Sequence, residues 1–95
     1  MIDVTLGASL VGYLPDGDQS YGHRSVALTA STWPETVREI RSRFEKLGER
    51  LFDESGRLRT GFVVAVNDEI VRGPDGPRLL GPGDRLYLFA QIAGG

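Results

Sequence analysis

One amphipathic helix interrupts a chain whose other apolar segments have the pattern of β-strands. Thr32-Trp33-Pro34-Glu35 is typical of a helix start: Thr32 can cap, Glu35 lies three residues on as a capping-box partner, and proline is tolerated in the first turn. Apolar residues then recur at steps of three and four, which gives one apolar stripe. They are Val37, Ile40, Phe44, Leu47 and Leu51. One stripe has to be buried against another element, so the sequence predicts a single main helix on one face of a sheet.

Two strands are predicted before the helix. Residues 2–14 begin with strict alternation, with Ile2, Val4 and Leu6 on one face, which is the period-2 signature of a half-buried strand. Gly7 and Gly12 interrupt this segment and indicate a bulge or a bend. A second alternating segment follows at 24–30, after a turn-rich loop at about 15–23, so the two strands are expected to form an antiparallel hairpin.

Three further segments follow the helix. Residues 61–66 form the most apolar run, which we expect to be a central strand buried on both faces. Asn67-Asp68 stands at a turn position before a short strand at 69–72. The stretch 73–83 contains seven glycines or prolines and is predicted as a loop, with Leu79-Leu80 as its apolar anchor. A final strand is predicted at 85–92.

This order of elements predicts an α+β fold in one domain spanning residues 1–95, with a short flexible tail at 93–95. A compact solution places the first and last strands side by side and parallel at the centre of a mixed sheet of four to five strands. One main helix then packs on one face of that sheet. This is the β-grasp, or ubiquitin-like, arrangement.

Composition excludes several classes of function. The chain has no cysteine, so thiolate catalysis, disulfides and zinc–thiolate sites are excluded. A net charge of −2 argues against a general nucleic-acid partner. No segment approaches a membrane span or a secretory signal, and we expect a cytoplasmic protein without a membrane partner. The only histidine, His23, lies in a polar loop, and the acidic residues lack metal-loop spacing, so no metal site is predicted.

The printed sequence ends in Gly94-Gly95, directly after an apolar run at 86–93. Glycine has no Cβ, so such a tail can pass through a narrow slot and carry the α-carboxylate with it. The expectation from the residues is that the reactive group of this protein is the carboxylate of Gly95.

Three local features resemble the ubiquitin-like sulfur-carrier family, which includes the small subunit of molybdopterin synthase and the thiamine-pathway sulfur carrier. They are the apolar strand with its turn, Phe62-Val63-Val64-Ala65-Val66-Asn67-Asp68-Glu69, the segment Leu80-Gly81-Pro82-Gly83-Asp84-Arg85-Leu86, and the ending Ile92-Ala93-Gly94-Gly95. The likeness spans roughly residues 34–95. The chain departs from the synthase subunit at Ala90-Gln91, where that subunit usually has two prolines, and in the glycine- and proline-rich stretch Gly73–Pro82.

The resemblance implies a carrier protein that is not itself an enzyme, or the small subunit of a synthase complex. An E1-like adenylyltransferase or sulfurtransferase would adenylate the carboxylate of Gly95, consuming ATP, and the product would become a thiocarboxylate. Gly94 would keep the tail thin. A sulfur-accepting synthase subunit would then take the sulfur for molybdopterin, thiamine or a similar product. No cofactor would be bound to the carrier itself.

Two other functions stay open at this point. The activated Gly95 could form an isopeptide with a target lysine, as in a ubiquitin-like protein modifier. The chain itself offers only Lys46 among eleven basic residues, which favours single conjugation over polymers. Alternatively the domain is a non-covalent β-grasp interaction module whose Gly-Gly is incidental.

The docking face for a partner is predicted from the final strand. Alternation places Leu86 and Leu88 opposite to Tyr87 and Phe89. We expect the leucines inside, and Tyr87 and Phe89 to form a partner-binding patch together with Ile92 and Ala93. The alternative is that Phe89 belongs to the core.

Overall fold

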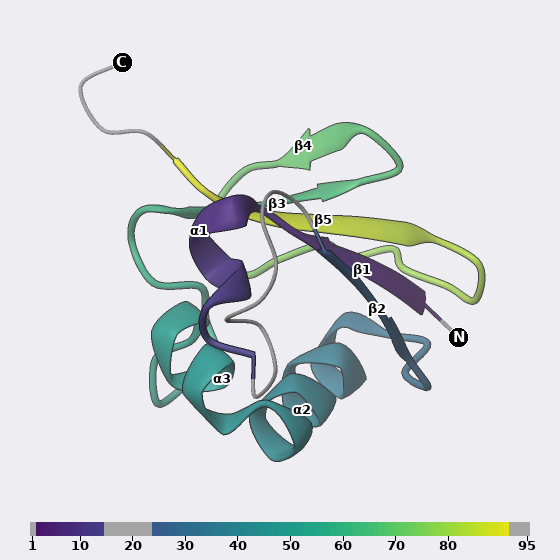
Figure 1. Cartoon of the computed structure of the whole chain (residues 1–95). Helices are drawn as coiled ribbons and strands as arrows, with labels where there is room; N and C mark the ends of the chain where they lie inside the picture. The colour runs from purple at the N-terminus through teal and green to yellow at the C-terminus, as the bar shows by residue number, and fades with distance from the viewer. Residues whose placement is uncertain (1, 15–23, 92–95) are drawn as a thin grey trace.

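The computed structural model describes residues 2–14 and 24–91, and residues 1, 15–23 and 92–95 lie outside the described part. A five-stranded sheet forms one layer, and helices α2 and α3 cover one of its faces (Figure 1). The elements are β1 (Ile2–Leu6), α1 (Ala8–Val11), β2 (Arg24–Leu28), α2 (Trp33–Arg43), α3 (Glu45–Leu51), β3 (Phe62–Val66), β4 (Glu69–Val71) and β5 (Arg85–Ala90). The predicted α+β class with a mixed sheet is confirmed.

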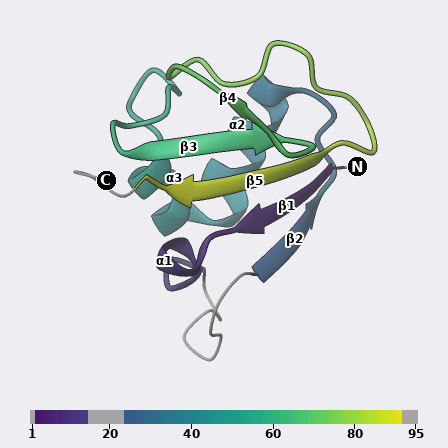
Figure 2. The ribbon, with the colours of Figure 1, turned by 90° about the horizontal axis from the view of Figure 1, so that it is seen from above.

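The strand order is β2-β1-β5-β3-β4, so the first and last strands are neighbours. β1 and β5 run parallel and the other pairs are antiparallel, which confirms the predicted β-grasp topology (Figure 2). β5, rather than the 61–66 segment, is the central strand. β3 lies between β5 and the edge strand β4. Because the helices cover only one face of the sheet, Val63 is half-buried, and the expectation that this strand is buried on both faces was wrong in part.

The core lies between the sheet and the helices. Alternate residues of β1 and β5 point into it and are buried, as the period-2 pattern predicted. They pack with residues of the predicted helical stripe. The buried residues of β1, β5, α2 and α3 that form this part of the core are Ile2, Val4, Leu6, Leu86, Leu88, Val37, Ile40, Leu47 and Leu51.

Residues 7–14 are not a strand, which corrects the prediction for 2–14. β1 ends at Leu6 and the short helix α1 follows, with Gly7 at its N-terminal cap in an extended conformation. Leu10, Val11 and Leu14 are buried. Their spacing of one and four places them on one side of a helical turn, whereas alternation would have exposed one of the first two. Gly7 is therefore neither a bulge nor a bend within a strand.

The predicted single helix is two helices. Thr32 caps α2 as expected, since its hydroxyl accepts the N–H of Glu35 at 3.3 Å, while the Glu35 carboxylate accepts the N–H of Ser31 at 3.0 Å. The helix breaks at Phe44, whose φ of −131° and ψ of 70° are not helical. Gly48 then lets α3 approach α2, because a Cβ there would lie 3.0 Å from the Cα of Arg41. Its role is close helix packing.

The loop at 73–83 is anchored differently from the prediction. Leu79 is 89% exposed, and Leu80 is only partly buried against the core. Gly76 and Pro77 are buried instead. Gly76 has a φ of +74° and lies against the indole of Trp33, so that a Cβ built on it would lie 2.8 Å from Cδ1 and nearer still to Nε1 and Cε2. The contact with an aromatic ring, which needs a residue without a side chain, replaces the expected leucine anchor.

The described residues include no helix that is long and apolar enough to cross a membrane.

Candidate functional site: the outer sheet face and the end of β5

The sheet face that points away from α2 and α3 carries an apolar cluster. We call it the outer face and define it by Val63, Ala65, Ile70, Tyr87 and Phe89. Strand register brings these residues together, because Val63 is paired with Phe89, and Ala65 with both Tyr87 and Ile70. Ile70 is 58% exposed, and Val63, Tyr87 and Phe89 are half-buried. The face thus presents apolar surface beside the last strand.

The predicted division of β5 is confirmed. Leu86 and Leu88 are buried in the core, whereas Tyr87 and Phe89 lie on the outer face. Their ring centroids are 4.8 Å apart with an interplanar angle of 35°. The alternative that placed Phe89 in the core is wrong. Gly7 supports this arrangement, since a Cβ on it would lie 3.0 Å from the Cβ of Phe89.

Sequence reasoning missed Val63 and Ile70 as members of this face. Neither residue shows a local sign of its role, because the role comes from pairing between strands. One signal was present: a two-residue turn at Asn67-Asp68 fixes the pairing of Val66 with Glu69, and therefore of Ala65 with Ile70. Both turn residues have positive φ, 48° and 74°, as such a turn requires.

A groove of ≈ 560 Å³ lies along this face between β3, β4 and the end of β5. Phe89, Val63 and Ile70 contribute apolar surface, while Arg59 and Arg72 supply two positive charges. None of the described residues that line it is acidic, although acidic residues outnumber basic ones in the chain by 13 to 11. The groove is therefore apolar with a positive rim.

The end of β5 is fixed at Gln91, whose N–H donates to the carbonyl of Gly61 at 2.7 Å. Gly61 has a φ of +99°, a conformation that favours glycine. Gln91 also lines the groove. The predicted site residues Ile92, Ala93, Gly94 and Gly95 lie outside the described residues, so the structure gives only the point at which they begin.

The side chain of Arg50, on α3, lies over two aromatic rings near the end of the sheet. The guanidinium of Arg50 lies 5.4 Å from the ring centroid of Phe62 and 5.9 Å from that of Tyr13. Phe62 is paired with Ala90 at the end of β5. Such contacts stabilise by about 0.5–1 kcal/mol at exposed sites. Through Arg50, α3 thus contacts the β3 residue that pairs with the end of β5.

The two internal motifs that carried the family resemblance hold each other in place. The Asn67 amide donates to the Asp84 carboxylate at 3.0 Å and accepts the N–H of Arg85 at 2.9 Å. Asp84 also accepts the N–H of Gly81 at 2.9 Å. The hydrogen bonds from Gly81 and Asn67 lower the pKa of Asp84 below its ordinary value. These motifs tie the β3–β4 turn to the start of β5, which makes them structural.

No group of three potential ligand side chains that could hold a metal ion is found in residues 2–14 and 24–91. Asp75 forms an ion pair with Arg57 at 3.1 Å. Asp53 accepts the N–H groups of Ser55 and Arg57, as in a capped turn. His23 lies outside the described residues.

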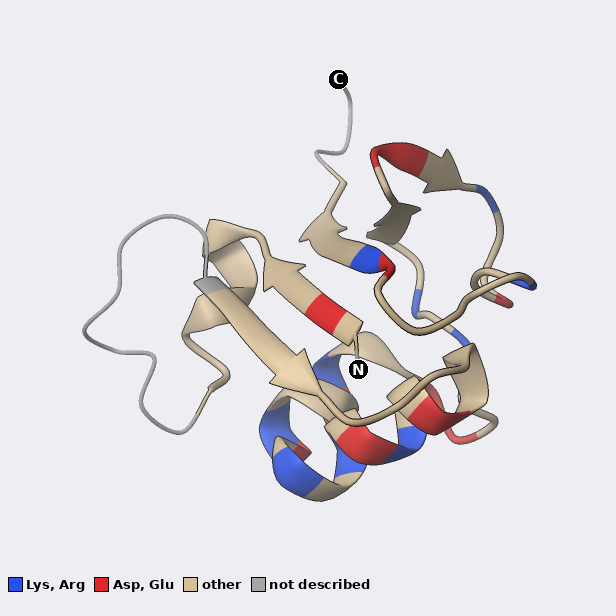
Figure 3. Ribbon diagram, turned by 90° about the vertical axis from the view of Figure 1, so that its right-hand side faces the viewer, with Lys and Arg blue, Asp and Glu red and all other residues tan. Residues whose placement is uncertain are grey.

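Charged residues are frequent in α2 and α3, and the strands contain few of them (Figure 3). The apolar outer face therefore differs chemically from the charged helices on the other side of the sheet.

The fold and this face define a ubiquitin-like β-grasp protein, and the resemblance to the sulfur-carrier family is confirmed. The chain is similar over 100% of its length, and over 100% of the other chain, to a chain in the crystal structure of the Amycolatopsis orientalis BexX/CysO complex, with 28% identity and a TM-score of 0.75.

Two further structures share the fold. Mycobacterium tuberculosis CysO is 24% identical with a TM-score of 0.68, covering 94% of this chain and 99% of that one. SAMP1 from Haloferax volcanii is 21% identical with a TM-score of 0.67, covering 99% and 98%. No protein-family model and no curated protein matches the sequence. The ubiquitin-like β-grasp fold is therefore what this chain shares with CysO and SAMP1.

Proposed function

We propose that this chain is a sulfur carrier whose Gly95 carboxylate is converted to a thiocarboxylate by a partner enzyme. The observation that carries the proposal is the structural match, at 28% identity over both full chains, to a chain of the BexX/CysO complex. The apolar outer face supports it, because that face borders the strand that leads to Gly94-Gly95.

The chemistry belongs mostly to the partner. The Gly95 carboxylate attacks the α-phosphorus of ATP and pyrophosphate leaves, which gives an acyl-adenylate. Hydrosulfide attacks the carbonyl carbon and AMP leaves, which gives the thiocarboxylate. If the sulfur comes from an enzyme persulfide, the acyl disulfide formed first is cleaved by a thiol, with release of a disulfide. The carrier supplies position and reach.

The tail has a short reach, so docking has to occur close to β5. Four residues follow Gln91, and a fully extended chain spans at most about 3.3–3.6 Å per residue, so Gly95 reaches about 14 Å from that point. The groove on the outer face begins at this point, because Gly61 and Gln91 both line it. We propose that an E1-like adenylyltransferase binds there, and that a sulfur-accepting synthase subunit uses the same face afterwards.

Intact-mass spectrometry tests the proposal. The chain is incubated with the cognate activating enzyme, ATP with magnesium, and a sulfide source. The expected result is the mass increase of one sulfur-for-oxygen exchange, absent without ATP and absent when Gly95 is deleted. A deletion of Gly95 that also lowered thermal stability strongly would contradict the role of the tail as a free reactive end.

The docking face is tested with matched variants. Ile70→Glu places a charge on the outer face, and Ser42→Glu places the same charge on α2, away from that face. We expect Ile70→Glu to lower the rate of adenylation and Ser42→Glu to leave it unchanged. Equal rates for the two variants would mean that the enzyme binds elsewhere.

A second candidate is a protein modifier, since two of the similar structures are of small archaeal modifier protein 1. Here the Nζ of a target lysine attacks the activated carbonyl of Gly95, AMP leaves, and a proton goes to solvent as the isopeptide forms. Covalent adducts on lysines of other proteins, rather than the sulfur exchange, would favour this function. If neither product forms, the domain is a non-covalent interaction module.

A further inference from the structure

The two edges of the sheet are protected in different ways. β2 and β4 are the edge strands, and an edge strand offers backbone N–H and C=O groups to any strand that approaches. β4 has only three residues, Glu69–Val71. Because the two-residue turn makes Val66 and Glu69 a hydrogen-bonded pair, Ile70 is the residue of β4 whose N–H and C=O point away from β3. Its short length limits pairing. β2 has five residues and needs another form of protection.

The outward groups of β2 can be identified from their contacts. In an antiparallel pair, alternate residues direct both their N–H and C=O away from the neighbouring strand. The carbonyl of Ala27 and the N–H of Thr29 are bound by side chains of α2, so these residues face away from β1. By the same two-residue spacing, Ser25 also faces outward. A further strand would pair with these three residues.

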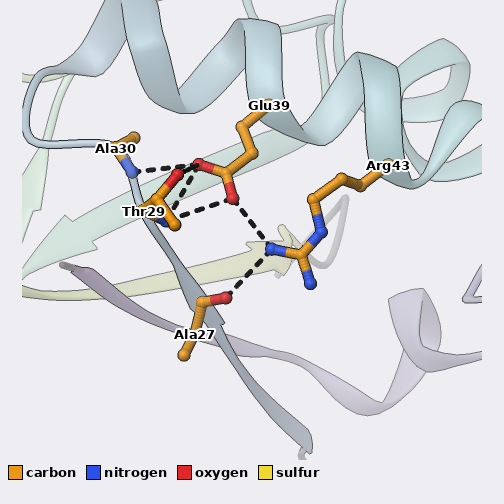
Figure 4. Close-up of polar contacts among 5 residues, drawn as sticks. All are labelled: Ala27, Thr29, Ala30, Glu39 and Arg43. Carbon is orange, nitrogen blue, oxygen red and sulfur yellow. Dashed lines mark hydrogen bonds and ion pairs between the residues drawn. The ribbon is translucent and has the colours of Figure 1, made fainter.

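Glu39 and Arg43 of α2 occupy that position (Figure 4). The two carboxylate oxygens of Glu39 accept the N–H of Thr29 at 3.0 and 3.1 Å, and Oε1 also accepts the N–H of Ala30 at 2.9 Å. Nη1 of Arg43 donates to the carbonyl of Ala27 at 3.1 Å and to Glu39 at 2.8 Å. Together the two side chains bind a backbone acceptor and a backbone donor two residues apart. Those are the groups that an added strand uses.

We propose that Glu39 and Arg43 close the β2 edge against pairing with a second copy of this chain. Nothing in the proposed function requires this contact, so the inference goes beyond that function. Its consequence is that the carrier stays monomeric with its outer face and tail available to partners.

A second copy fits this edge chemically. Antiparallel self-pairing about Ala27 places Ser25 opposite Thr29 of the other copy, and Val26 opposite Leu28. These are small hydroxyl and aliphatic pairs, and no like charges face each other at these positions. An open hollow of ≈ 810 Å³ beside Thr29 and Ala30 leaves space next to the edge. Among residues 2–14 and 24–91, the side chains of Glu39 and Arg43 are the ones that bind the backbone groups of Ala27 and Thr29.

Sedimentation velocity of the full chain tests the proposal. The double variant Glu39→Ala/Arg43→Ala opens the edge, and the single variant Arg43→Ala opens only the carbonyl of Ala27. Two controls on the same helix leave both side chains in place: Arg38→Ala removes a charge, and Ile40→Val weakens core packing. Wild type and controls should remain monomeric. The double variant should self-associate at least about tenfold more tightly, which corresponds to about 1.4 kcal/mol.

Amide hydrogen exchange locates the contact. In the self-associated double variant, the outward N–H groups of Ser25 and Ala27 should gain protection as the protein concentration rises. Association of Ile40→Val to the same extent would mean that lost stability is the cause, and the proposal would fail. It would also fail if a folded double variant stayed monomeric, or if protection appeared away from β2. If the double variant does not fold, sedimentation velocity and amide hydrogen exchange of the single variant Arg43→Ala test the proposal instead.

Discussion

The contact between Gly76 and Trp33 predicts an unusually costly Gly→Ala substitution. Gly76→Ala forces a residue with a Cβ to adopt a φ of +74°, which costs about 1–2 kcal/mol. The added methyl group would also overlap sterically with the buried indole of Trp33, and overpacking of this kind costs about 1–3 kcal/mol. Trp33 cannot move freely, because it packs edge-on against Phe52 with ring centroids 6.0 Å apart. We expect a total loss of about 2–5 kcal/mol in the free energy of unfolding.

A matched glycine in the same loop isolates the steric part. Gly73 has a φ of +93° and nothing within 4 Å of a built Cβ, so Gly73→Ala should show the backbone cost alone. Urea unfolding at constant m-value gives both free energies. For a domain of this size each kcal/mol lowers Tm by about 4–8 °C. The reasoning is refuted if the two variants lose the same stability. Leu79→Ser should be nearly neutral, since Leu79 is 89% exposed; a large loss would restore leucine as the anchor of the loop.

Three further predictions follow from other contacts. Gly61→Ala should lose about 1–2 kcal/mol in urea unfolding, because its φ is +99°, and should raise amide exchange at Gln91; unchanged exchange would mean that Gly61 does not fix the end of β5. Gly7→Ala should shift the aromatic NMR signals of Phe89, since the new Cβ lies 3.0 Å from that side chain, whereas Gly12→Ala, with open space around it, should not. The pKa of Asp84 is lower in the folded state, so its stabilising contribution is present above the ordinary carboxyl pKa and is lost as pH falls through the folded value. Asp84→Asn should therefore make stability fall less steeply as the pH is lowered into the acid range, and an unchanged slope would contradict the stabilising role of the hydrogen bonds from Gly81 and Asn67 to Asp84.

The sequence predicted the parts of the fold that depend on local pattern. Alternation identified the buried faces of β1 and β5, and Thr32 marked the start of α2 because capping is a local interaction. The Asn67-Asp68 turn was also found. In each of these cases the sequence pattern and the structural feature that it predicts involve residues only a few positions apart in the chain.

The missed features depend on contacts between distant segments. The break at Phe44 has no mark in the sequence, since its neighbours are ordinary helix formers and the break allows Gly48 to meet Arg41. The sequence around Gly76 does not distinguish it from other loop glycines, because its role depends on its contact with the distant residue Trp33. The helix at 8–11 was hidden because Gly7 and Gly12 mark several kinds of irregularity equally well.

The residues of the candidate site also fall into two groups, those predicted from local pattern and those that depend on contacts between distant segments. Tyr87 and Phe89 were assigned to the outer face from alternation within one strand, and the structure agrees. The place of Val63 and Ile70 depends on strand pairing, which joins β4 to β3 and β3 to β5. The roles of Ile92, Ala93, Gly94 and Gly95 stay predictions.

The position of β5 between β1 and β3 makes folding depend on the most C-terminal strand of the sheet. Without residues 85–90 the sheet divides into two separate hairpins, β1–β2 and β3–β4, and neither alone covers the helices. A nascent chain therefore cannot complete its core until β5 has left the ribosome. Pairing of the first and last strands also closes a loop of nearly the whole chain, which favours slow folding. A ribosome-bound chain lacking β5 should be protease-sensitive, so quality control can discard an unfinished chain before any partner binds it.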